Sequence, residues 1–102
     1  MSRREKLDRM LEQEPEDVFL NFGLAMELAK EGSMQMAIAQ LDRVLELDAG
    51  YVAAYFHKGN ALIGCERLED ARSVLTEGIA VAQSAKDAHS ESELRELLGS
   101  IS

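Results

Sequence analysis

The apolar residues of this chain recur every three or four positions along nearly its whole length, as in Leu20, Leu24 and Leu28. This spacing places them on one side of an α-helix, and no alternating pattern typical of a β-strand competes with it. Residues that end helices are followed closely by residues that start them at five points in the chain. The sequence therefore predicts six helices joined by short antiparallel turns, at 3–13, 16–31, 34–47, 51–64, 68–84 and 88–100.

Two of these breaks carry recognisable capping residues. Gly32 can end a helix in the left-handed conformation while Ser33 caps the helix that follows. Ser90 and Glu93 have the spacing of a capping box near the start of the last helix. Both patterns support helix starts near the predicted positions.

A chain of short helical hairpins is expected to show an internal period, and this one does. Residues 18–51 align with residues 52–85, and the matched positions fall where helices would touch. The identical pairs are Val18 with Val52, Phe22 with Phe56, Leu28 with Leu62, Ala37 with Ala71, and Leu41 with Leu75.

These units resemble the tetratricopeptide repeat family, whose repeating unit of roughly 34 residues is a helical hairpin. The family's characteristic positions are occupied in the first unit by Asn21, Leu24, Ala25, Leu28, Ala37, Leu41 and Ala49, and in the second by Tyr55, Lys58, Gly59, Leu62, Ala71, Leu75 and Gln83. Small residues at some of these positions make physical sense, because two helices approach closely only where neither carries a bulky side chain.

The resemblance implies an all-α fold in which antiparallel helical hairpins stack as a short right-handed solenoid. We expect one domain over 1–102, divided into an N-terminal capping helix (1–17), a first repeat (18–51), a second repeat (52–85) and a C-terminal capping helix (86–102). The last helix does not keep the period and has one polar side, as the terminal helix of a repeat array requires.

The chain departs from the family pattern at a few positions. Asn21 replaces the usual large aromatic residue, Lys58 replaces a leucine, and neither full unit ends in proline. Lys58 can lay its methylene stem on the core while its ammonium group stays in water. We therefore expect weaker packing at this position within the same fold.

Composition and charge narrow the range of partners. The chain has 102 residues, 46% of them hydrophobic, and a net charge of −8, which would repel nucleic acid and anionic lipid. The single cysteine, Cys65, has no internal disulfide partner, and no apolar run predicts a signal peptide or a membrane span. We expect an acidic cytoplasmic protein in which Arg3, Arg4 and Lys6 form a solvated helix start.

Candidate chemistry is sparse. His57 and Cys65 could be imagined as a base and a nucleophile, but eight residues along a helix separate them by about 12 Å, too far for a hydrogen bond. His89 and Glu93 could supply at most two ligands to a metal on the surface. We therefore expect a non-enzymatic protein without a metal or a cofactor, and an enzyme centred on His57 is a distant alternative.

The segment from Phe19 to Met26 points to a binding surface. At 100° per residue, Phe19, Phe22 and Met26 lie roughly opposite the side that carries Leu24 and Leu28. The resemblance implies that positions of the former kind line the concave groove of the repeat. The candidate partner-binding residues are Phe19, Phe22, Met26, Phe56, Asn60 and Ile63.

The sequence leaves three possibilities for what covers this apolar groove. One is internal: the first or last helix folds over it, or Phe22 turns inward against Phe56. The second is an apolar or amphipathic segment of a partner protein, whose backbone Asn60 could hold. The third is another copy of the chain, which would make the protein a homodimeric assembly protein. Relatives that clamp a terminal carboxylate use several basic groups in the groove, and because only Asn60 and Lys30 fall near such places, we expect no carboxylate clamp.

Overall fold

The computed structural model describes all 102 residues and contains six helices and no strands. The helices are α1 (Arg3–Gln13), α2 (Val18–Lys30), α3 (Met34–Leu47), α4 (Val52–Gly64), α5 (Leu68–Ser84) and α6 (Ala88–Gly99). The prediction of six helices is confirmed, and every predicted boundary lies within two residues of the observed one.

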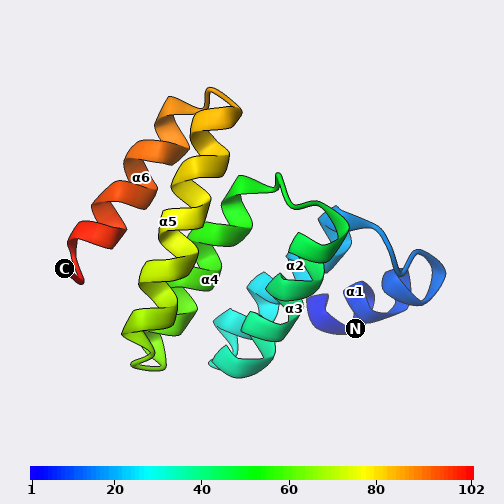
Figure 1. Cartoon of the computed structure of the whole chain (residues 1–102). Helices are drawn as coiled ribbons and strands as arrows, with labels where there is room; N and C mark the ends of the chain where they lie inside the picture. Colours follow the sequence, from blue (N-terminus) through cyan, green and yellow to red (C-terminus); the bar gives the residue numbers. More distant parts are fainter.

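The helices form an extended array rather than a closed bundle (Figure 1). Each helix packs against the helix that follows it in sequence, and α6 lies against both α5 and α4. The array measures 41 × 29 × 19 Å, and Figure 1 shows the N-terminal helix at one end and α6 at the other. Packing that is limited to near neighbours is the property that defines a helical-repeat solenoid, so the all-α solenoid prediction is confirmed.

The tight turns α2–α3, α4–α5 and α5–α6 share one conformation. Each contains a residue with positive φ, namely Gly32 (84°), Glu66 (60°) and Lys86 (57°). In each turn the N–H of the next residue donates to a carbonyl five residues earlier, which closes the helix end. Gly32 and Glu66 hold the same position in the two repeats. Lys86 has no such counterpart, because α5 has 17 residues whereas α3, the equivalent helix of the first repeat, has 14.

Close approach of α4 and α5 depends on two glycines. A Cβ added at Gly59 would lie 2.5 Å from Leu75 Cδ2, and one added at Gly78 would lie 2.5 Å from the Cβ of Tyr55. Leu75 is fully buried and Tyr55 is 4% exposed, so both belong to the interior. At each of these two contacts, the backbone of one helix therefore packs directly against a side chain of the other.

Asn21 explains one departure from the family pattern. It is 4% exposed, and its amide donates to the carbonyls of Pro15 (3.1 Å) and Asp17 (2.8 Å) while its Oδ1 accepts from Gln40 Nε2. The aligned residue of the second unit, Tyr55, donates its hydroxyl to the carbonyl of Ala49 at 2.6 Å.

Pro15 and Ala49 are related by the same shift that aligns the two repeats, so the two side chains tie down the same carbonyl of the preceding junction. A fully hydrogen-bonded amide thus replaces the aromatic residue without leaving a buried polar group unpaired. The second departure is resolved in a similar way, because the ammonium group of Lys58 pairs with Asp42 of α3 while the lysine side chain is only 22% exposed.

The terminal helices are attached by different means. α1 buries only Leu7, which contacts α2 at Gly23, and two ion pairs join Arg3 to Glu27 and Arg4 to Glu31. The side chain of Arg3 stays 68% exposed, as the predicted solvated helix start implies, and both arginines in addition pair with carboxylates of α2.

α6 buries Leu94 completely and packs further apolar residues against the cluster formed by α4 and α5. Its cap differs from the sequence prediction: Asp87, not Ser90, is the N-cap, and its carboxylate accepts from the Ser90 N–H and hydroxyl. Ser33 makes no side-chain capping bond, and a complete capping box lies instead at Ser2 and Glu5. Spacing alone could not choose between neighbouring Asp and Ser residues that both accept hydrogen bonds readily.

Candidate functional site

Three hollows lie in a row on the side of the array formed by α2, α4 and α6, which we call the groove face. The hollow nearest the N-terminus is lined mainly by apolar residues of α2, α3 and α4: Met26, Ala29, Met34, Ala37, Leu41, His57, Asn60, Ala61 and Gly64. The middle hollow lies between α4 and α6 and is lined by Val52, Ala53, Phe56, His57, Ser90, Glu93 and Leu94. The last is lined by Phe56, Glu93, Glu96, Leu97 and Ser100.

Aromatic rings connect these hollows. The ring of Phe22 lies 5.0 Å from that of Tyr51 and 5.5 Å from that of His57, and His57 lies 5.4 Å from Phe56. These distances, with tilted or edge-to-face planes, fall in the range of favourable ring contacts. The resulting aromatic row, Tyr51–Phe22–His57–Phe56, crosses the groove face from α2 to α4.

His57 occupies the centre of this arrangement, since it lines two of the three hollows and touches two phenylalanine rings. Burial among these rings lowers the pKa of His57, and the negative charge of Glu93 on α6 opposes that shift. The side chain therefore favours the neutral imidazole, which keeps one donor and one acceptor available.

The candidate residues predicted from sequence occupy different environments. Phe19 is 75% exposed at the start of α2. Phe22 and Met26 are half-buried and pack against the cluster of Ala25, Leu41, Val44 and Ala54. Phe22 and Met26 thus serve both the core and the groove face.

The other three candidates lie on α4. Phe56 separates the two hollows beside α6, and exposed Asn60 shares the N-terminal hollow with Met26. Ile63 is half-buried against a cluster formed by α3, α4 and α5. Phe22 does not stack on Phe56; the ring that lies between them is that of His57.

Sequence reasoning missed His57, Glu93 and Glu96 as residues of this face. His57 directly follows a position already assigned to the groove, and that adjacency was the available signal. Glu93 and Glu96 were missed because α6 breaks the repeat period, so no aligned position pointed to them. Their place flanking the apolar residues Leu94 and Leu97 could have indicated the edge of the packed side.

The rest of the molecule has little other chemistry. His89 Nε2 lies 3.5 Å from Glu93 Oε1, and no three side chains of the kinds that bind metals come together. Cys65 is half-buried and packs against the cluster of α3, α4 and α5. None of the six helices combines the length and apolar character needed to cross a membrane.

A family comparison decides the fold family. The sequence model described as tetratricopeptide repeat matches residues 28–93, which is more than half of the chain. This chain belongs to the tetratricopeptide repeat family. Tetratricopeptide repeat (TPR) proteins are generally non-enzymatic modules for protein–protein interaction, and the sequence-based assignment to this family is confirmed.

Individual relatives agree with this assignment. The chain is 30% identical over 90 residues to a TPR repeat-containing protein of Pseudomonas aeruginosa, with 88% of this chain and 86% of that protein covered. It is similar to the solution structure of a TPR domain protein from Salinibacter ruber, with a TM-score of 0.79, 31% identity and coverage of 85% and 88%.

A third TPR relative has been solved with a bound partner. The TPR2B domain of yeast Sti1, in a complex with pHsp70, matches with a TM-score of 0.90 and 26% identity, covering 96% of this chain and 78% of that one.

Proposed function

We propose that this TPR protein is a non-enzymatic interaction module that binds an apolar or amphipathic segment of a partner protein on its groove face. The observation that carries the proposal is the row of three hollows along one face, joined by the aromatic row. Half-buried aromatic side chains beside hollows are typical anchors of binding surfaces, because they remove much apolar area from water when a partner covers them.

Each part of the groove face suits a different feature of such a segment. Met26 and Met34 in the N-terminal hollow are flexible and polarisable, so they can adapt to apolar side chains of varied shape. Asn60 is exposed at the same hollow and offers an amide to the backbone of an extended or helical ligand. The exposed ring of Phe19 adds an apolar contact at the start of α2.

The complex of the Sti1 TPR2B domain with pHsp70 supports peptide binding as the general mode. The ligand chemistry proposed here differs from a carboxylate clamp, because no lysine or arginine lines any of the three hollows. The division into two repeats, 18–51 and 52–85, with capping helices at 1–17 and 86–102, is part of the same proposal. In it, α6 completes the groove rather than covering it.

A selection from a displayed library of random peptides, each about twelve residues long, tests the proposal. We expect wild-type protein to enrich peptides rich in apolar residues, and the variant Asn60→Arg to bind them at least tenfold more weakly because it fills the N-terminal hollow. Met36→Lys is the matched control, since Met36 is 53% exposed on α3 and lines none of the hollows. Circular dichroism confirms that both variants fold.

Self-association through the same face is the alternative. Sedimentation velocity across a range of concentrations separates the two functions. A tight dimer that Asn60→Arg disrupts would replace the peptide-binding proposal. A protein that stays monomeric and enriches no peptide from the library would contradict both functions.

A further inference from the structure

We infer that the last hollow of the row, formed by Phe56 and the outer part of α6, receives a lysine or arginine side chain of the bound segment, so that the ligand is a basic amphipathic segment of a partner protein. This inference rests on the proposed function and assigns the chemistry of one end of the groove. It concerns the hollow lined by Phe56, Glu93, Glu96, Leu97 and Ser100, whose volume is about 260 Å³.

The walls of this hollow match the two halves of a long basic side chain. Phe56 and Leu97 are its apolar residues, and they can cover the methylene stem of a lysine or arginine. Glu93 and Glu96 place two carboxylates at the same hollow, which also has the aromatic ring of Phe56 in its lining. An aliphatic side chain would contact only the apolar residues Phe56 and Leu97, and an acidic side chain would be repelled by the two carboxylates.

The two carboxylates are not neutralised within the chain. Glu96 takes part in none of the salt bridges, and the nearest partner of Glu93 is His89 at 3.5 Å. On the same helix, Glu91 contrasts with them, because it accepts from Arg95 at 2.9 Å and from Gln83 at 3.2 Å. Both carboxylates are exposed, so Glu93 and Glu96 are free to pair with an external cation.

Charge also distinguishes between the molecules that could occupy this hollow. A symmetric contact centred on this hollow would bring the carboxylate pair close to its own copy in a molecule of net charge −8. The arginines of α1 could not supply the cation readily, since Arg3 and Arg4 already pair with Glu27 and Glu31. The same negative charge repels nucleic acid and anionic lipid, and it favours a basic segment of another protein.

The order of the hollows sets the direction of the ligand. The hollow beside α2 has only Asn60 and His57 among otherwise apolar lining residues, whereas the hollow at the far end of the row holds both carboxylates. A segment that spans the groove face thus places apolar side chains near α2 and its basic residue near α6. Complementary charge at one end fixes orientation as well as partner choice.

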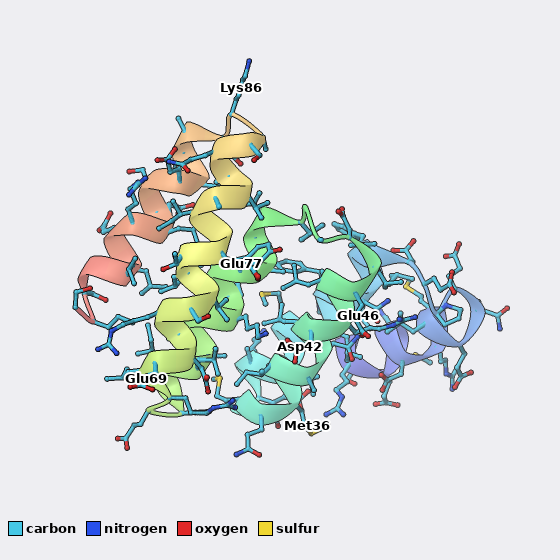
Figure 2. All side chains as sticks on the ribbon, in the orientation of Figure 1. Met36, Asp42, Glu46, Glu69, Glu77 and Lys86 are labelled. Atoms are coloured by element: carbon cyan, nitrogen blue, oxygen red, sulfur yellow. The ribbon has the colours of Figure 1, made fainter.

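Charge reversal tests the inference. Random peptides of about twelve residues are selected on wild-type protein, and the best-enriched peptide is then titrated against Glu93→Lys/Glu96→Lys. The matched control is Glu46→Lys/Glu77→Lys, which changes the net charge equally at exposed positions on α3 and α5 (Figure 2). Neither control residue lines a hollow on the groove face.

We expect the selected peptides to carry lysine or arginine beside apolar residues, and binding to fall about tenfold in Glu93→Lys/Glu96→Lys but less than twofold in the control. A second selection on the reversed variant should favour aspartate or glutamate instead.

The possible results separate this inference from the proposed function. Suppose that the selected peptides lack basic residues and bind Asn60→Arg more weakly, but bind Glu93→Lys/Glu96→Lys as tightly as the wild type. That result would overturn the inference while leaving the proposed peptide binding on the groove face supported. Equal losses in the reversed and control variants would also overturn it, because they would reflect net charge alone. Selected peptides that are insensitive to Asn60→Arg and to the reversal, or a selection without any enrichment, would overturn both.

Discussion

Replacing Gly78 with alanine tests the packing of the second hairpin most sharply. Gly78 lies inside α5, where alanine ordinarily stabilises a helix by about 0.5–1 kcal/mol relative to glycine. Here the new methyl group would lie 2.5 Å from Tyr55 Cβ, 3.0 Å from Tyr55 Cγ and 3.3 Å from Leu94 Cδ2. The contact with a Cβ cannot be relieved by changing the rotamer of Tyr55, so α4 and α5 must move apart.

The magnitude follows from these opposing effects. Ordinary contacts of a Cβ begin near 3.4 Å, so the helices must separate by nearly 1 Å at this point. Overpacking of a well-filled core costs about 1–3 kcal/mol, and the displacement also loosens the completely buried Leu94. After the gain in helix propensity is subtracted, we expect Gly78→Ala to lower the free energy of unfolding by about 1–2 kcal/mol.

Urea denaturation followed by circular dichroism measures this change, and thermal unfolding should show a melting temperature lower by about 5–15 °C. Gly64→Ala is the matched control, because Gly64 ends α4, is exposed and has no atom within 4 Å of an added Cβ. That variant should be as stable as the wild type, or more stable by about 0.5 kcal/mol.

A Gly78→Ala protein as stable as Gly64→Ala would refute the reasoning. Such a result would mean that α4 and α5 do not approach each other as closely as the structure shows, or that they separate at no cost.

Other contacts in the molecule give three further predictions. Asn21→Leu should lower the free energy of unfolding by about 1–3 kcal/mol in urea titrations, because it removes the partner of the Pro15 carbonyl and of the Gln40 amide, and an unchanged stability would show that water replaces Asn21 there. The folded state holds the pKa of His57 below its ordinary value of 6.5, so unfolded chains bind the proton first and stability should fall as the pH drops from about 7 toward 5; His57→Gln should flatten this part of the profile, and an unaltered slope would assign it elsewhere. Arg3→Ala/Arg4→Ala should speed hydrogen exchange in α1 while leaving α4 and α5 protected, since Leu7 is the only buried residue of α1; equal loosening of all helices would contradict this hierarchy.

The sequence predicted the fold well because its strongest signals are local and periodic. Leu28 and Leu62, which hold equivalent positions in the two repeats, are both buried on α2 and α4 as the repeat pattern requires. Ala37 and Ala71 mark the same close helix contact in α3 and α5. Helical periodicity and a repeated spacing thus sufficed for the elements and their order.

The candidate site was harder to predict because it depends on contacts between distant helices. No periodic argument indicates that the His57 ring lies between Phe22 and Phe56, since that depends on how α2 and α4 are placed. The hydrogen bonds of Asn21 to a preceding junction are equally invisible, because they arise from a turn at Pro15 that carries no regular pattern. Glu93 lies on α6, which follows the 17-residue α5 and falls outside the repeat period, so no aligned position indicated it.

The central claim, that partners bind the groove face, is tested most directly by amide chemical-shift changes in NMR during titration with a peptide selected on the wild-type protein. We predict that the largest changes occur at Met26, Phe56, Asn60 and Glu93 on α2, α4 and α6, with Met36 on α3 unaffected. Changes that concentrate instead around Met36 and the outer sides of α3 and α5 would contradict the account.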